Sequence, residues 1–138
     1  MKRLLGIDVG RRRVGVALSD PCGLLATGLT VIDVKKKNAI DEIDRLARTH
    51  GVEMAVVGLP LNADGSSGPA VDMVRAFGAA LERRTGLRVA YVDERYTSVV
   101  ADEAMVEGRV AWRRRKELVD KLAAQLILQR YLDEALGS

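Results

Sequence analysis

Two short apolar runs open the chain, LLGIDV at positions 4–9 and VGVAL at positions 14–18, with GRRR between them. Both runs are rich in residues that favour strands, and the glycine and arginines between them are typical of a turn. A third apolar run, Leu24–Val31, follows after Asp20-Pro21-Cys22-Gly23. Because connections this short join neighbouring antiparallel strands, the N-terminal part of the chain predicts a three-stranded meander.

Beyond the meander, helical patterns alternate with strand patterns. They predict a helix capped by Asn38 and ending near His50-Gly51, a strand Met54–Leu59, a helix from Pro69 to about Thr85-Gly86, a strand Leu87–Val92, a helix from Thr97 or Ser98 to Glu107-Gly108, and a long helix Arg115–Leu136. Strands that alternate with helices lie parallel in one sheet. We therefore expect a single α/β domain over residues 1–138. Its mixed five-stranded sheet has three antiparallel strands, then two parallel strands, and helices on both faces.

The composition of the 138 residues, 48% hydrophobic and 30% charged, argues against a disordered tail, a collagen-like repeat and a membrane protein. No apolar run reaches the length of a spanning helix, and the N-terminus turns polar too early for a signal peptide. The one cysteine, Cys22, has no partner for an internal disulfide and no metal-binding motif around it. We therefore expect a cytoplasmic protein with no membrane partner.

The net charge of +3 conceals strong clustering of the basic residues. Ten of the 22 Lys and Arg residues fall in Arg11–Arg13, Lys35–Lys37 and Arg113–Lys116. Such clustering indicates a polyanion partner, although for each run taken alone a solvated turn is an equal explanation. Aromatic residues make up only 4% of the chain, which argues against a surface that stacks many bases and favours contact with a phosphate backbone.

Three carboxylates stand at unusual positions, and the first is Asp8, inside an apolar strand where Asp is rare. Alternation places it with Leu4 and Gly6 on one face of the strand, opposite Leu5 and Ile7. One explanation is an Asp that accepts hydrogen bonds in the following turn. The other, which we favour, is a functional site, because a buried carboxylate needs a partner such as a metal ion.

The second and third carboxylates are Glu94 and Asp120. Glu94 follows the strand Leu87–Val92 at its carboxyl end, where α/β sheets place their ligands, although a surface ion pair with Arg95 explains it equally simply. Asp120 stands on an otherwise apolar strip of the last helix, made of Ala124, Ile127 and Tyr131. A structural ion pair with Arg or Lys is the alternative there; a charge on an inward strip is more often functional.

The three carboxylates converge if the expected fold forms. Oxygen-rich clusters of this kind bind Mg²⁺ or Mn²⁺, and such ions activate water and stabilise the leaving oxygen in phosphodiester hydrolysis. The one histidine, His50, ends a helix beside a glycine. No Ser-His-Asp set is therefore available, which argues against acyl-transfer hydrolysis.

Motifs in the same order along nearly the whole chain resemble those of the YqgF (RuvX) family. They are Gly6-Ile7-Asp8-Val9-Gly10, Arg13-Val14-Gly15-Val16-Ala17, Gly58-Leu59-Pro60-Leu61-Asn62 with Asp64-Gly65-Ser66, Asp93-Glu94-Arg95-Tyr96-Thr97-Ser98, and Val119-Asp120-Lys121-Leu122-Ala123-Ala124 with Ile127-Leu128-Gln129. The resemblance implies a ribonuclease-H-like fold and a cytoplasmic nuclease that matures the 5′ end of pre-16S rRNA, in older usage a Holliday-junction resolvase. The family's three acids fall on Asp8, Glu94 and Asp120. Resolvases of this fold often carry a fourth acid one turn further along the last helix, where Lys121–Ala124 offers none.

The leading hypothesis is a metal-dependent nuclease in ribosome biogenesis, with Asp8, Glu94 and Asp120 as catalytic residues that hold Mg²⁺ or Mn²⁺. Its nucleic-acid-binding residues are Arg11, Arg12, Arg13, Arg95, Arg113, Arg114, Arg115 and Lys116. The expected partner is precursor rRNA, in free form or in a ribosomal particle, and the chain acts as a monomer or homodimer. Trp112 packs on a sugar or base, or anchors the last two helices. The loop Leu61–Gly68 is a lid, a phosphate cradle or a plain surface loop.

Other classes of function stay open from the sequence. A resolvase of branched DNA needs a two-fold dimer to cut symmetrically. A non-catalytic RNA-binding module for ribosome assembly needs none of the three acids. A fragment of a sugar kinase or an actin-like ATPase also fits the Gly-x-Asp-x-Gly turn, although those folds place a nucleotide between two related domains.

Overall fold

The computed structural model describes residues 3–62, 64–94 and 112–137 of the chain. Its elements, in order, are β1 Arg3–Val9, β2 Arg13–Ser19, β3 Ala26–Asp33, α1 Ala39–His50, β4 Val52–Leu59, α2 Pro69–Thr85, β5 Arg88–Asp93 and α4 Trp112–Gly137. The helix expected from Thr97 or Ser98 to Glu107-Gly108, and Arg95, lie outside the described residues. Within the described ranges, no helix combines the length and apolarity needed to cross a bilayer.

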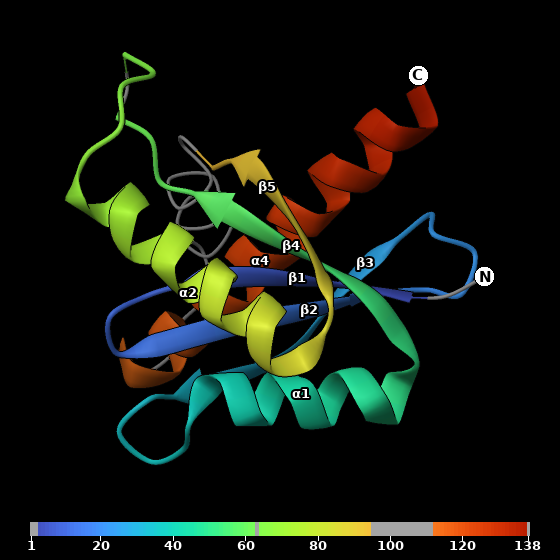
Figure 1. Cartoon of the computed structure of the whole chain (residues 1–138), viewed down its shortest axis with the longest axis horizontal. Coiled ribbons are helices and arrows are strands. Elements are labelled where there is room, and N and C mark those ends of the chain that lie inside the picture. Colours follow the sequence, from blue (N-terminus) through green and yellow to red (C-terminus); the bar gives the residue numbers. More distant parts are fainter. Residues whose placement is uncertain (1–2, 63, 95–111, 138) are drawn as a thin grey trace.

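The strands form one sheet in the order β3-β2-β1-β4-β5 (Figure 1). β1 pairs with β2, and β2 with β3, in antiparallel fashion, as the short connections of the meander predict. β4 pairs in parallel with β1 and with β5. α1 carries the chain back from β3, which runs in the same direction as β1, to β4, and α2 carries it back from β4 to β5. The predicted mixed five-stranded sheet is confirmed.

Helices cover both faces of this sheet, with α1 and α2 on one side and α4 on the other (Figure 1). Along β1 the predicted alternation is confirmed. Leu5 and Ile7 are fully buried in the core under α1 and α2, whereas Leu4 packs with the core under α4. The two cores therefore share each strand and use alternate residues of it.

The helix ends follow the expected capping chemistry. The side chain of Asn38 accepts a hydrogen bond from the Asp41 N–H at 3.0 Å, and α1 ends at Gly51 with φ of 66°. Pro69 opens α2, where its missing N–H costs no helical hydrogen bond, and Gly86 ends it in the left-handed region. These caps fix where α1 and α2 deliver the chain into β4 and β5.

Several predicted boundaries shift: β4 begins at Val52 and not at Met54, α4 begins at Trp112 and not at Arg115, and β3 spans Ala26–Asp33 in place of Leu24–Val31. The start of β3 differs for a structural reason. Leu24 and Leu25 belong to the hairpin turn, and more than half of each side chain's surface is exposed. The carboxylate of Asp20 accepts hydrogen bonds from the backbone N–H groups of both leucines, at 2.7 and 3.2 Å. Turn hydrogen bonds of this kind take precedence over the strand preference of two leucines.

α4 lies unusually close to the sheet because glycines line its path across β1, β2 and β3. A Cβ on Gly6 would come within 2.5 Å of the Leu128 Cβ, and a Cβ on Gly15 would overlap the carbonyl oxygen of Asp120. Gly28 lies under the Lys121 side chain in the same way. The helix backbone thus rests almost directly on the strands.

Candidate active site

Asp8 projects from the carboxyl-terminal end of β1 toward α4. It lies on the same face as Leu4 and Gly6, and its Cα partner on β2 is Gly15. It is half-buried between the sheet and the helix. The structure therefore places this carboxylate in the interior, and not in the β1–β2 turn that the simpler explanation required.

Glu94 is held at the end of β5 by its backbone. Its N–H donates to the carbonyl oxygen of Leu59 at 3.0 Å, and the preceding carbonyl, of Asp93, accepts from Arg130 Nη1 at 2.7 Å. A Cβ on Gly58, the neighbouring residue of β4, would stand 2.8 Å from Glu94 Oε2. The absence of a side chain at Gly58 therefore leaves the space in which the Glu94 carboxyl turns toward Asp8.

Asp120 comes to the same place from α4. Its carbonyl oxygen rests over Gly15, the residue directly opposite Asp8, so the close approach of helix and sheet sets the position of Asp120. Ala124 and Ile127, one and two turns further on, are buried as the predicted apolar strip requires. The Asp120 carboxylate itself pairs with Arg13, with Nε 2.5 Å from Oδ2 and about a quarter of each side chain exposed.

The pKa values of Asp8 and Glu94 are both raised, because the two carboxyls are largely shielded from water and lie near other carboxylates. Burial raises the pKa of Glu94 to about 9, and the charge of Asp8 adds to this effect. Burial also raises the pKa of Asp8, with the charge of Asp120 adding to it, whereas the hydrogen bond with Glu94 lowers it. Glu94 therefore keeps a proton at neutral pH and donates it in a hydrogen bond to Asp8.

This donor set suits a hard divalent cation. Asp8 and Glu94 share a proton because two adjacent buried carboxylates do not both ionise without positive charge, and a cation with oxygen ligands supplies that charge. As the side chains stand, no three His, Cys, Asp or Glu residues of the described ranges are grouped to hold a metal ion. Asp120, whose charge acts on Asp8, is occupied by Arg13.

The sequence places eight basic residues against nucleic acid, and the structure separates them. Arg11 and Arg12 are exposed at the β1–β2 turn, whereas Arg13 faces the acids through Asp120. Lys116 is exposed on α4. Arg113–Arg115 and Trp112 form the first turn of α4, and their side chains, like all of Arg95, lie outside the described residues.

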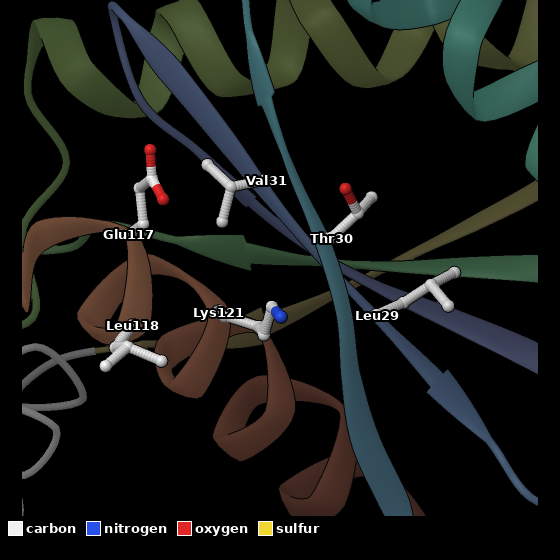
Figure 2. Close-up of a pocket in the computed structure, with 6 residues that line it drawn as sticks. All are labelled: Leu29, Thr30, Val31, Glu117, Leu118 and Lys121. Atoms are coloured by element: carbon white, nitrogen blue, oxygen red, sulfur yellow. The ribbon is translucent and has the colours of Figure 1, made fainter. Parts of the chain in front are cut away.

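A separate groove of about 360 Å³ lies between β3 and the first half of α4 (Figure 2). Leu29, Thr30 and Val31 line it from the strand, and Glu117, Leu118 and Lys121 from the helix. Val31 pairs with Gly15, which pairs with Asp8 on its other side, and α4 crosses the sheet over Gly15. The helix therefore separates this groove from the carboxylates.

The loop after β4 folds on itself. The Asn62 N–H donates to the Ser66 carbonyl oxygen at 2.9 Å, and the Ser66 N–H and hydroxyl both donate to Asp64 Oδ1. The loop also starts beside the acids, because Leu59, just before it, accepts the Glu94 N–H. These hydrogen bonds describe a compact turn at the edge of the site.

The sequence does not predict what Gly15, Gly58 and Arg13 do beside the acids. Gly15 and Gly58 stand in the family motifs, but only the packing shows that they make room for Asp120 and Glu94. The Arg13–Asp120 pair joins residues 107 positions apart. A structural partner for Asp120 was the stated alternative in the sequence, yet the pattern gave no means of choosing the arginine.

Known proteins resemble this chain both in sequence and in fold. A Streptococcus pneumoniae (strain Hungary19A-6) protein named "Putative pre-16S rRNA nuclease" is 47% identical over 135 residues, which cover 95% of this chain and 97% of that protein. Thermus thermophilus RuvC in complex with a Holliday junction substrate has the same fold. Its TM-score is 0.59 at 18% identity, over 99% of this chain and 97% of the other.

The fowlpox virus Holliday junction resolvase also has this fold, with a TM-score of 0.54 at 11% identity over 97% of this chain and 99% of the viral one. The ribonuclease-H-like class expected from the sequence is thus confirmed. A family model described as RuvX, Holliday junction resolvase, matches residues 2–134. The chain therefore belongs to the RuvX (YqgF) family, as its motifs predict.

Proposed function

We propose that this protein is a nuclease that hydrolyses phosphodiester bonds in the precursor of 16S rRNA. Asp8, Glu94 and Asp120 are its catalytic residues and hold Mg²⁺ or Mn²⁺ at the bond that is cut. The observation that carries the proposal is the half-buried, hydrogen-bonded Asp8–Glu94 pair at the ends of β1 and β5, with Asp120 close enough for its charge to act on Asp8. The reaction class agrees with the family and its relatives, which are named as nucleases or resolvases.

A divalent cation bound by these carboxylates supplies the charge that activates a water and stabilises the leaving oxygen. The chain's own residues prepare the place. Asp8 and Glu94 present carboxylate oxygens from the ends of β1 and β5, the strands on either side of β4, and loss of their shared proton turns the pair into a strong cation ligand. Gly58 leaves room for the Glu94 carboxyl, because a Cβ there would stand 2.8 Å from Glu94 Oε2.

The phosphate backbone is held by the basic residues around the acids. Arg13 is already at the site, where its guanidinium matches the geometry of a phosphate as well as that of a carboxylate. Arg11, Arg12 and Lys116 are exposed nearby on the β1–β2 turn and α4, and Arg95 and Arg113–Arg115 complete the proposed set. These contacts position the strand and do not read its sequence.

Precursor rRNA is the first candidate substrate because it stands in the names of curated relatives that match nearly the whole chain. Branched DNA is the second, and the description of the family model favours it. A cytoplasmic location suits the exposed, unpaired Cys22. A ribosomal particle as the carrier of the RNA, and a monomer or homodimer as the active form, belong to the same proposal.

The test is cleavage of a precursor 16S rRNA fragment and of a four-way DNA junction, each with Mg²⁺ and with Mn²⁺. Wild type is compared with Asp8→Asn and Asp120→Asn, and Asp72→Asn, an exposed carboxylate of α2, serves as the matched control. We expect loss of at least about 100-fold in rate for the two site variants and none for the control, because each lost carboxylate weakens electrostatic stabilisation at the reacting phosphate.

The substrate cut faster by wild type identifies the physiological class. Cleavage by Asp8→Asn at the wild-type rate contradicts the proposal that Asp8 is a catalytic residue. RNA binding that survives in a protein that cuts neither substrate points to the non-catalytic assembly module.

A further inference from the structure

The lysine run Lys35–Lys37 forms a fixed turn at the end of β3. The Asp33 carboxylate accepts the Lys35 N–H at 3.0 Å, and the Asp33 carbonyl oxygen accepts the N–H groups of Lys36 and Lys37, both at 3.0 Å. All three lysine side chains are exposed. The backbone is therefore ordered by its own hydrogen bonds while the three ammonium groups project into solvent.

This turn joins the arginine turn between β1 and β2. The Val34 N–H donates to the Arg12 carbonyl oxygen at 3.0 Å, and Asp33 is the Cα partner of Arg13 in the sheet. Arg11 and Arg12 are exposed like the lysines. Two basic runs that lie far apart in the sequence thus form one surface, here called the basic edge: Arg11, Arg12, Lys35, Lys36 and Lys37.

The carboxylates closest to the lysines in sequence have other partners. Asp33 is used by the lysine turn itself, Asp41 pairs with Arg84 at 2.7 Å, and Glu42 pairs with Arg45. Lys37 contributes to the lowered pKa of Glu42, but only as the last of its causes, after Arg45. Within the described residues, no member of the basic edge forms an ion pair, so its charge is left for a partner from outside.

The basic edge lies at the same end of the molecule as the acids. Asp8 is two residues from the β1–β2 turn that carries Arg11 and Arg12. In Figure 1 the β1–β2 turn, the loop between β3 and α1, and the first turn of α4 are all at the left. The backbone of Arg113–Arg115 belongs to that first turn, so the three basic runs of the sequence meet around one end of the sheet.

We propose that the basic edge binds backbone phosphates of the RNA substrate on one side of the bond that is cut, an inference that rests on the proposed function. Clustered lysines without counter-ions favour a nucleic acid over a protein partner, because protein interfaces are depleted in lysine and rely on aromatic anchors. Repeated phosphates also match a row of mobile ammonium groups that fix no single geometry. The lysine turn thus extends the footprint of the RNA beyond the catalytic acids.

The experiment measures binding of a base-paired precursor 16S rRNA fragment in chelator, at several salt concentrations. The variant Lys35→Gln/Lys36→Gln removes two charges of the basic edge and leaves Lys37 beside Glu42 in place. The matched control, Arg83→Gln/Arg88→Gln, removes two exposed charges from the end of α2 and the start of β5. We expect the lysine variant to bind about tenfold more weakly, with a salt slope flatter by roughly one to two, and the control to match wild type.

The same proteins are then given a small chromogenic phosphodiester, bis(p-nitrophenyl) phosphate, with Mn²⁺. It is too short to reach the basic edge, so the lysine variant should hydrolyse it at the wild-type rate. Equal RNA affinity for the lysine variant and wild type, or equal loss in the control, overturns the proposal. Weaker binding of polyglutamate with unchanged RNA affinity instead assigns the surface to an acidic protein.

The two proposals fail in different ways. If Asp8→Asn cuts RNA as well as wild type does, the proposed function is wrong, and the binding measurement in chelator still decides the role of the lysines. If Asp8→Asn is inactive and the lysine variant binds RNA normally, the proposed catalytic site is supported and the proposed RNA contact at the basic edge is wrong.

Discussion

The two faces of the sheet are built from alternate residues of the same strands, yet they meet opposite demands. Under α1 and α2 the strands present large apolar side chains such as Ile7, Val14 and Val57, all buried. Under α4 they present Gly6, Gly15 and other small residues, with Asp8 among them. The face under α1 and α2 is packed with large side chains, whereas the face under α4 has small residues that let the helix lie close to the strands.

This difference separates stability from chemistry. Volume buried under α1 and α2 stabilises the fold through the hydrophobic effect and makes no use of particular atoms. The glycine-lined face brings the α4 backbone down onto β1 and β2, so that Asp120 stands over the strand neighbour of Asp8. If the two faces are separable in this way, a change under α1 and α2 alters stability alone, whereas a change under α4 also alters the cleavage rate.

The largest effect is expected from Gly15→Ala. The new Cβ overlaps the Asp120 carbonyl oxygen, so α4 has to shift and the third carboxylate moves away from Asp8. Overpacking of this kind costs about 1–3 kcal/mol in unfolding free energy, and a displacement of about 1 Å at a catalytic group costs roughly 100-fold in rate. Urea unfolding and the RNA cleavage assay measure the two quantities.

Val14→Ala, the adjacent residue of β2 on the opposite face, is the matched control. It leaves a cavity under α1 and α2 and should lower the unfolding free energy by a similar amount, about 1–3 kcal/mol. Its cleavage rate per folded molecule should stay within about twofold of wild type. If the two variants lose the same activity, the faces are not separable.

The same contrast explains what the sequence predicts well. Large apolar residues in period two identify β1 and β2, and the inward strip of α4 identifies Asp120, because burial leaves a periodic pattern. Glycines on the α4 face weaken that pattern, and nothing local says that Gly15 supports a helix backbone more than 100 residues later in the chain. The run Arg11–Arg13 predicts Arg13 as a phosphate contact like its two neighbours; only the fold shows that its guanidinium pairs with Asp120.

A middle-sized effect is expected from Arg13→Gln, on the glycine-lined face. Arg13 holds an Asp120 oxygen that the proposed metal site needs, so the guanidinium and the cation compete for it. Removing this one nearby charge should raise the affinity for Mn²⁺ in the absence of nucleic acid by about tenfold, the size of one close charge interaction in a partly exposed site. Calorimetric titration with Mn²⁺ measures the change.

Arg12→Gln provides the control, because it removes the same charge from the same turn but from an exposed side chain. We expect less than about a twofold change in Mn²⁺ affinity for it. In the Asp120→Asn background, Arg13→Gln should no longer raise the affinity for Mn²⁺, because the carboxylate for which Arg13 and the cation compete is absent. A gain that persists in that background means that Arg13 acts by charge at a distance and not through Asp120.

The smallest effect concerns the stability cost of the acids themselves. The ordinary pKa of glutamate is 4.5, and in the folded protein burial raises the pKa of Glu94 to about 9. Between these two values the unfolded chain has lost the proton and the folded protein has kept it, so the stability of the metal-free protein falls as pH rises through the window.

Glu94→Gln removes that titration. In chelator at pH 8 it should be more stable than wild type, with a higher Tm and a flatter pH dependence of stability between the two pKa values. Glu53→Gln, an exposed glutamate of β4, should keep the wild-type slope. An unchanged slope in Glu94→Gln means that the pair does not share a proton. If the slope flattens as expected, the carboxyls under α4 lower the stability of the metal-free protein, because the fold keeps Glu94 protonated where water would ionise it. The residues proposed for the chemistry then act against the stability of the sheet.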